Sequence, residues 1–418
     1  MLALLLACTG PRAELPPTIG ERIGDYRFAT PIDTPSTLAM LDGTEVDTRA
    51  STCGACHPGH LAEWSATTHA DAVRDVQYLA EMSKPGQPRW LCLNCHAPTS
   101  PQRSLLITPE TRLAAAGSVE RVEAAPNPAF DPARVAEGIG CAACHVRRDD
   151  DGEGTVVGPR GSGRAPHRVR HDAAALEGVC EGCHSPGANI VITPTFPCWF
   201  TTAEEVAAGP QAGSRCVDCH MPSTSRAAAA GAPAELLRAH TWPGGGLPKH
   251  VDDLESLADW QPGLDVAVSV APLEVRLVNA RAGHAIPTGD PERHVLVEAR
   301  AIDAQGAPLA SDLLRIGQTW DWGDDTTGRP ARKLADNRLQ AAETRAWTPR
   351  LSLAGAARVE VTVTYVRLTE KNAAEMAQVR LDEELRQFWP DLPIDLGEPM
   401  ADYPRQRVIF NESYPIGP

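Results

Sequence analysis

The pentapeptide C-x-x-C-H occurs five times in this sequence and constrains the fold more than any other feature. The copies are Cys53-Cys56-His57, Cys92-Cys95-His96, Cys141-Cys144-His145, Cys180-Cys183-His184 and Cys216-Cys219-His220. Each thiol can bond to one vinyl group of a porphyrin, and the adjacent imidazole can bind the iron, so this pattern is the attachment signature of c-type haem. A zinc site needs four ligands and gives no reason for a histidine after every second cysteine. The sequence predicts five covalent haem c groups with the motif histidines as proximal ligands.

The composition fits an acidic globular chain whose apolar core is supplemented by porphyrin. Of the 418 residues, 42% are hydrophobic and 22% charged, but only 5% are aromatic. The net charge is −15, and haem propionates would add further negative charge. This charge argues against nucleic acid and anionic lipid as partners. It suits docking with basic redox partner proteins, although an acidic surface also serves solubility; the donor and acceptor and the oligomeric state are left open.

Two cysteines lie outside the motifs, Cys8 and Cys198. Cys8 ends a short apolar run, MLALLLAC, in which Leu-x-Ala-Cys resembles the bacterial lipobox, so we expect lipidation at Cys8; a clipped signal peptide is the alternative. Haem attachment of this kind implies an exported protein, in the periplasm or at the cell surface of a bacterium. For Cys198 we expect a small buried apolar residue rather than a free thiol or an intermolecular disulfide.

The chain divides by composition into four segments. Residues 1–8 form the signal or lipobox segment, and residues 9–45, rich in Pro and Thr, form a tether. Residues 46–260 carry all five motifs in a Gly-, Pro- and Ala-rich background, which predicts a mostly helical and irregular pentahaem cytochrome c domain. Residues 261–418 are expected to form a β-rich domain with a helix near 370–388. The predicted fold class is therefore α+β, a multihaem domain followed by a β-sandwich-like C-terminal domain.

Period-two alternation of β-branched residues carries the β-sandwich prediction. Alternating apolar positions occur at 266–270, 273–277, 295–299 and 359–365, with polar and glycine-containing turns between them. In the first half, residues 60–82 show the periodicity of a helix, and 103–116 and 233–240 show it more weakly. The stretch VRRDDDGEGTVV, 146–157, predicts a hairpin with a Gly-containing turn rather than a calcium loop.

The sixth ligand of each iron decides whether a haem only passes electrons or can bind substrate. Histidines outside the motifs are the candidates, and we expect His69, His167, His240 and His284 to be distal ligands. His69 is too close to His57 in sequence to fold back onto the same haem, so it should reach a neighbouring one. His171 and His250 are weaker candidates. His60 is expected beside a propionate or in solvent, and His294, which starts a strand, is expected to be exposed.

Several words around these histidines resemble one family of multihaem cytochromes. They are CGACHPGHLAEWSATTHADAV, CLNCHAP, GIGCAACH, CVDCHMP, RAHTWPGG and GHAIPTG. They resemble the multihaem c-type cytochromes related to the tetrahaem carrier of ammonia-oxidising bacteria, with hydroxylamine oxidoreductase and pentahaem nitrite reductase as more distant relatives. The resemblance covers residues 50 to about 300. It implies closely packed haems and distal ligation by His69, His240 and His284.

Two departures bear on catalysis. All five motifs end in His, so the Lys substitution typical of the nitrite reductase active haem is absent, as are the eight motifs of hydroxylamine oxidoreductase. The sequence therefore favours electron transfer through mostly bis-histidine haems, with no side chain in acid–base chemistry. One alternative is an oxidoreductase acting on a nitrogen or sulfur oxyanion at one five-coordinate haem. A second is a subunit of a conductive filament in which a neighbouring copy supplies the fifth distal histidine.

Overall fold

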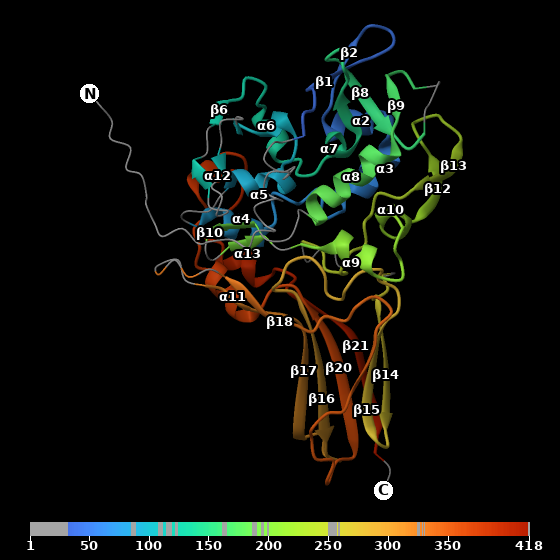
Figure 1. Ribbon diagram of the computed structural model, residues 1–418, viewed down its shortest axis with the longest axis vertical. Coiled ribbons are helices and arrows are strands. Elements are labelled where there is room, and N and C mark those ends of the chain that lie inside the picture. The colour runs from blue at the N-terminus through green and yellow to red at the C-terminus, as the bar shows by residue number, and fades with distance from the viewer. Residues whose placement is uncertain are drawn as a thin grey trace, which may run out of the picture.

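A computed structural model describes most of the chain. The described residues are 32–84, 89–107, 112–113, 119–121, 124–160, 165–185, 190–193, 196–198, 200–249, 257, 260–323, 327, 329 and 331–416. Cys8, the first part of the tether, His250 and the side chain of Cys198 lie outside them. The expected mixed α+β class is confirmed, with helices and small sheets at one end of the molecule and long strands at the other (Figure 1).

Each motif lies on a helix or directly after one. Four helices end at the motif histidine, whereas His57 follows the last residue of the first of these helices. The motif helices are α2 (Ala50–Cys56), α5 (Arg89–His96), α7 (Cys141–His145), α8 (Ala173–His184) and α10 (Cys216–His220). The others in this half are α3 (Pro58–Ser65), α4 (Val76–Ser83), η1 (Ser100–Gln102), α6 (Pro132–Val135) and α9 (Thr202–Ala208). One helical turn suffices to bring the two thiols of a motif to the same side.

Short strands connect these helices in two- and three-stranded sheets. The antiparallel two-stranded sheets are β1 (Thr37–Ala39) with β2 (Glu45–Asp47), β3 (Leu105–Ile107) with β6 (Ala124–Pro126), β4 (Arg112–Leu113) with β5 (Val119–Arg121), β10 (Ile190–Thr193) with β11 (Phe196–Cys198), and β12 (Ser223–Ala227) with β13 (Ala234–Arg238). In the three-stranded sheet, β8 (Gly154–Gly158) pairs antiparallel with β7 (Val146–Arg148) and parallel with β9 (Val169–His171). The predicted hairpin at 146–157 is confirmed, and Gly152 in its turn has φ +85°, which favours glycine.

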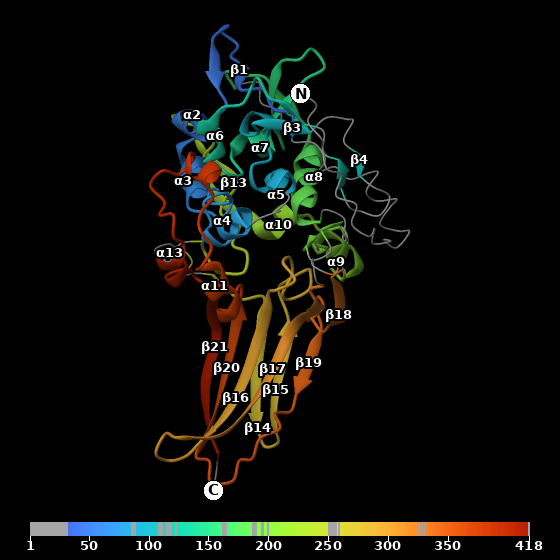
Figure 2. The ribbon, with the colours of Figure 1, turned by 90° about the vertical axis from the view of Figure 1, so that its left-hand side faces the viewer.

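Two antiparallel sheets form the long end of the molecule and enclose one apolar core (Figure 2). One sheet has the order β14 (Leu264–Val270), β15 (Leu273–Asn279), β19 (Thr344–Trp347). The other has the order β18 (Arg332–Asp336), β17 (Pro308–Asp321), β16 (His294–Ile302), β20 (Arg358–Val366), β21 (Gln406–Pro415). The alternation read from the sequence holds, since Val275, Leu277, Val295, Val297 and Val361 are fully buried.

The C-terminal helices pack on the motif-bearing end rather than on the sheets. They are α11 (Glu370–Met376), α12 (Glu383–Arg386) and α13 (Gly397–Ala401). Met376, Leu396 and Met400 share a core with Leu79 and Met82 of α4, far away in sequence. The motif region is thus enclosed by segments from both ends of the chain. Among the described residues, no helix is both long and apolar enough to cross a bilayer.

Several expectations about local structure were wrong. Residues 60–82 do not form one helix, because α3 ends at Ser65 and α4 begins at Val76 after a series of turns. The described parts of 103–116 and 233–240 contain short strands, and 370–388 is divided into α11 and α12. His294 is only 5% exposed rather than exposed, because β16 is the central strand of its sheet. For the strands and for His294, pairing with neighbouring strands overrides the local pattern.

Candidate functional site

A metal-bound imidazole usually donates the N–H of its other ring nitrogen to an acceptor. Three motif histidines make such a contact with a backbone carbonyl oxygen. The Nδ1 atom lies 2.6 Å from the Ala228 carbonyl oxygen in His57, 2.6 Å from Ala72 O in His96 and 2.8 Å from Val157 O in His145. A carbonyl oxygen only accepts, so Nδ1 must carry the proton in these contacts. Nε2 then keeps its lone pair for a metal ion, and the ring orientation is fixed.

Four motif histidines each have a second imidazole opposite them. The ring centroids are 6.5 Å apart for His57 and His167, 6.3 Å for His184 and His69, 6.0 Å for His145 and His240, and 6.2 Å for His220 and His284. These partners are the four histidines that we expect to be distal ligands. The structure also brings His69 to the haem motif at His184 rather than to the motif at His57, as its short sequence separation from His57 requires.

The separation of these rings fits one iron between each pair. A metal–imidazole bond is about 2 Å long and the ring centre lies about 1 Å beyond the nitrogen, so two axial imidazoles on one metal have centroids about 6 Å apart. Three of these four partner rings also have the Nδ1 contact: His167 with Arg168 O at 3.2 Å, His240 with Arg238 O at 3.1 Å and His284 with Ala285 O at 3.0 Å. The donor set and spacing therefore fit haem iron.

Burial keeps several of these rings in the neutral form that can bind a metal. Desolvation lowers the pKa of His69 and of His240 to about 3, and that of His184 to about 4. The neighbouring imidazoles contribute in the same direction, since a second positive charge nearby would be unfavourable. Neutral imidazole is the ligating form, so these histidines would bind iron without first losing a proton at neutral pH.

His96 differs from the other motif histidines. Its nearest ring is Tyr78, stacked on it at 4.1 Å, and no second imidazole faces it among the described residues. Imidazole binds a metal through a nitrogen in the plane of its ring, so the Tyr78 ring stacked on its face does not take the place of a second axial imidazole. Of the weaker distal candidates, His171 is exposed at the end of β9 without a ring contact to any described motif histidine, and His250 lies outside the described residues.

His60 lies near two of these paired histidines but is held by an arginine side chain. Its centroid is 5.7 Å from that of His57 and 5.0 Å from that of His240. However, Arg226 Nη1 lies 2.6 and 2.7 Å from the two ring nitrogens of His60, and Arg226 is itself paired with Glu63 at 3.0 Å. A neutral imidazole has one nitrogen with a free lone pair, and Arg226 lies within donating distance of either nitrogen, so His60 has no lone pair left for iron. No sequence motif marks Arg226, because its role depends on folding of the β12–β13 hairpin.

Among the buried side-chain polar atoms without a partner in the described protein are the Tyr78 hydroxyl, next to His96, and the Arg293 Nε atom. Buried polar atoms are nearly always satisfied, so these two are candidates to pair with a group other than protein. A haem carries two carboxylates that could fill this need. By contrast, no three His, Cys, Asp or Glu side chains converge within the described residues as a zinc site requires.

Contacts between the motif helices give the order in which the motifs lie. Helix α2 contacts α7, and α8 contacts α5, α7 and α10. The motif on α7 therefore lies next to the motif on α2. The motif on α8 is a junction, because it lies next to the motifs on α5, α7 and α10.

Comparison with known proteins agrees with these observations. The family described as cytochrome c554 and c-prime matches residues 52–118, which contain the first two motifs. A penta-haem cytochrome c552 from Thermochromatium tepidum has a similar fold, with a TM-score of 0.54 at 19% sequence identity over 88% of this chain and 99% of that one. No curated protein matches the sequence. The family match and the shared fold support a multihaem c-type cytochrome; the particular relation to the ammonia-oxidiser carrier stays a prediction.

Proposed function

We propose that this protein transfers electrons through five covalently bound c-type haems, four of them with two axial histidines. The observation that carries this proposal is the set of four imidazole pairs with centroids 6.0 to 6.5 Å apart, each containing one motif histidine. An iron with two imidazole ligands has no open position, so it exchanges electrons without binding substrate. Redox partner proteins, rather than nucleic acid, are the expected partners.

The order of the motifs supports a branched route. Electrons would pass from the haem at His57 to that at His145 and then to that at His184, because α2 contacts α7 and α7 contacts α8. At His184 the route would divide toward the haems at His96 and His220, since α8 also contacts α5 and α10. The haem supplies the redox chemistry, and the protein holds neighbouring haems together and excludes water from their ligands.

The test is low-temperature electron paramagnetic resonance (EPR) of the oxidised, purified protein, integrated against its total haem. The proposal expects five haems per chain, with four low-spin signals of bis-histidine type. A protein with no covalent haem, or with most irons high-spin, would contradict it. Dilution of the sample also tests the filament alternative, because ligation by a neighbouring copy would make the spin state depend on protein concentration.

A second candidate function rests on His96, which has no facing imidazole among the described residues. If that iron is open, the haem at His96 could bind a nitrogen or sulfur oxyanion and receive electrons through the haem at His184. The same EPR experiment then shows one high-spin haem in five, and nitrite, hydroxylamine or cyanide shifts its signal. A fifth low-spin signal unaffected by these ligands would assign the sixth position to a protein side chain and refute this candidate.

Export and lipidation complete the proposal. Multihaem c-type cytochromes are typically exported, and the lipobox-like run ending at Cys8 supports membrane attachment through a lipid. Mass spectrometry of the mature N-terminus tests this part directly. A diacylated Cys8 would support the anchor, whereas an unmodified N-terminus beyond residue 8 would contradict it.

A further inference from the structure

The distal histidine proposed for the haem at His220 comes from a different part of the molecule than the motif that it faces. His220 ends α10 in the motif region, whereas His284 lies in the loop between β15 and β16, on the side of the sheets. The two rings are nearly parallel, with an interplanar angle of 7°. Since no covalent connection near either residue sets this geometry, some contact between the two parts of the molecule must hold the His284 loop in place.

The carboxylate of Glu205 makes that contact. Glu205 lies on α9, and one of its oxygens accepts hydrogen bonds from the backbone N–H of Ala285, at 3.2 Å, and from the hydroxyl of Thr288, at 2.7 Å. Ala285 directly follows His284, so Glu205 fixes the backbone at the ligand itself. Thr202 Oγ1, from the same helix, lies 2.9 Å from Thr288 Oγ1 and strengthens the connection.

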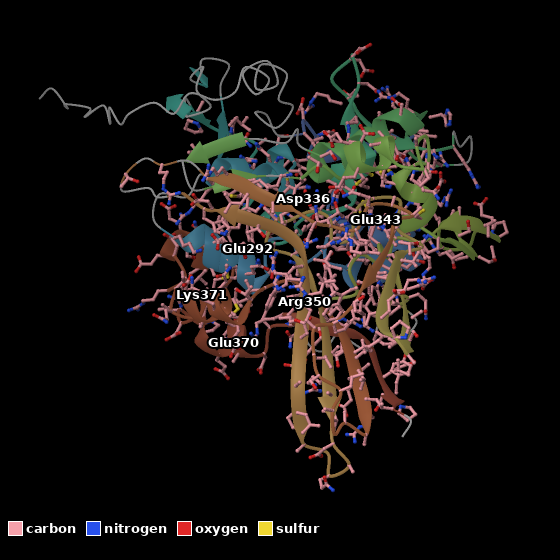
Figure 3. All side chains as sticks on the ribbon, turned by 60° about the horizontal axis from the view of Figure 1, so that its bottom comes forward. Glu292, Asp336, Glu343, Arg350, Glu370 and Lys371 are labelled. Carbon is pink, nitrogen blue, oxygen red and sulfur yellow. The ribbon has the colours of Figure 1, made fainter. Side chains whose placement is uncertain are left out.

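The second oxygen of Glu205 is held as firmly. It accepts from the Thr201 hydroxyl at 2.9 Å and from Arg338 Nη1 at 2.5 Å. The side chains of Glu205 and Arg338 are each only 9% exposed, and Arg338 is also held by Asp336, which is labelled in Figure 3. A buried carboxylate with four donors has one well-defined position, and removing its charge would leave Arg338 without its pairing across the boundary.

The His284 loop is also held to the sheets by contacts that do not involve Glu205. A change at Glu205 therefore leaves the position of the loop on the sheets in place. Asn279 Nδ2 donates to His284 O at 2.8 Å, and Ile286 exchanges backbone hydrogen bonds with Leu339. These contacts fix the loop relative to the sheets. Glu205 and Thr202 of α9, together with the segment after α9 that packs beside Gly283, fix it relative to the motif region, so these contacts decide whether His284 meets His220.

We propose that Glu205 is the positioning residue that holds His284 opposite His220 and so keeps the haem at that motif six-coordinate. This inference rests on the proposed function, because it requires a haem at His220 with His284 as its distal ligand. It adds that the coordination of this one haem depends on a buried ion pair between two parts of the chain. Electron flow into that branch would therefore depend on how the two parts are docked.

The experiment measures the spin state of the full-length, haem-loaded protein in four forms. Glu205→Gln keeps the side-chain size, but its NH2 group must face either Arg338 or the donors on Ala285 and Thr288. Glu204→Gln is the matched control, since Glu204 is the exposed neighbour on α9. His284→Ala defines the full change, and wild type is the reference. We expect Glu205→Gln to convert up to one further haem in five to high-spin, and Glu204→Gln to leave the spectrum unchanged.

Imidazole and redox titration separate positioning from general damage. Added imidazole should restore the low-spin signal of Glu205→Gln, and only one midpoint potential should shift. Wild-type spectra for Glu205→Gln, beside a high-spin haem in His284→Ala, would overturn the inference and leave the proposed function standing. Conversion of several haems together would overturn it as well, because it would indicate general loosening. An unchanged spectrum in His284→Ala would instead refute the ligation at His220 on which the inference rests.

Discussion

The two ends of the molecule are stabilised in different ways. The sheets share one apolar core of twelve buried residues, eleven from five strands and Leu339 from the loop after β18. In the motif region, the cluster formed without the C-terminal helices contains only Leu38, Ala142 and Val146. The larger cluster around Leu79 is completed by residues of α11 to α13. The sheets therefore have a protein core of their own, whereas the helices that carry the motifs largely lack one.

This difference indicates what fills the motif region. A chain of this length normally buries enough apolar surface to stabilise itself, and the hydrophobic effect scales with that area. Five porphyrins surrounded by short helices would bury their own apolar faces and those of the surrounding side chains. The haems would then serve both as the redox groups and as the core. The predictions below test this contrast between a protein core and a haem core.

The largest effect should come from removing the haem at the junction. Cys180→Ser with Cys183→Ser prevents attachment on α8, which contacts three other motif helices. We expect α5, α7 and α10 to lose protection in hydrogen exchange measured by mass spectrometry, because the group that they pack around is missing. The strands β16 and β20 should keep their protection.

A matched variant calibrates that result. Cys53→Ser with Cys56→Ser also removes one haem, but from α2, which lies at one end of the motif order. Its loss should affect α2 and α7 and leave α10 protected. Equal loss of protection in the sheets and in the motif helices would show that the two ends fold as one unit, contrary to the comparison.

A smaller effect is expected from the protein core of the sheets. Leu277→Ala removes a fully buried side chain and should lower the free energy of unfolding by about 2–5 kcal/mol. The haem spectrum should not change, because no haem contacts that core in the proposed arrangement. Denaturant unfolding followed by circular dichroism measures the loss. Leu313→Ala is the control, since Leu313 is 55% exposed, and it should change the free energy far less.

The smallest effect concerns the contact between the two ends, at Glu292. Its carboxylate accepts from Asn372 of α11 at 2.7 Å, and burial, with Asp290 nearby, raises its pKa from an ordinary 4.5 to about 7 (Figure 3). Because the folded protein holds this proton more tightly than the unfolded chain, stability is lost as the pH rises from about 4.5 to about 7.

A thermal unfolding series across that pH range checks this expectation. The contribution of Glu292 should be constant above pH 7, and Glu292→Gln should remove this part of the pH dependence. Glu298→Gln, on the neighbouring strand β16, serves as the control. The same slope in wild type and Glu292→Gln would contradict the assignment.

The sequence predicted the sheets better than the motif region, for a physical reason. Alternation in β14, β15, β16 and β20 reflects one buried face, which is a local property of each strand. Helical periodicity failed at 233–240, where β13 pairs with β12, because a two-stranded hairpin is stabilised by its partner strand rather than by its own pattern. The interruption between α3 and α4 was also missed, and His69 lies within those turns.

For the site, the sequence identified residue types but not their partners. The motif fixes each proximal histidine by covalent spacing, and spare histidines are easily recognised as candidate ligands. Which imidazole faces which motif depends on packing over long sequence separations, as for His69 and His184. Glu205, Tyr78 and Arg226 were missed because no motif marks a residue that acts through contacts made only in the folded chain.

The four imidazole pairs have a consequence for the chain as a polymer. With the ligation proposed above, each iron would act as a cross-link, closing a loop of about 60 to 120 residues and reducing the entropy of the unfolded chain. The loops overlap in sequence: the span from His57 to His167 contains His69, the span from His69 to His184 contains His145, and the span from His145 to His240 contains His220. Each cross-link therefore begins inside the previous loop, so the chain from His57 to His284 could not become fully extended without opening an iron–histidine bond.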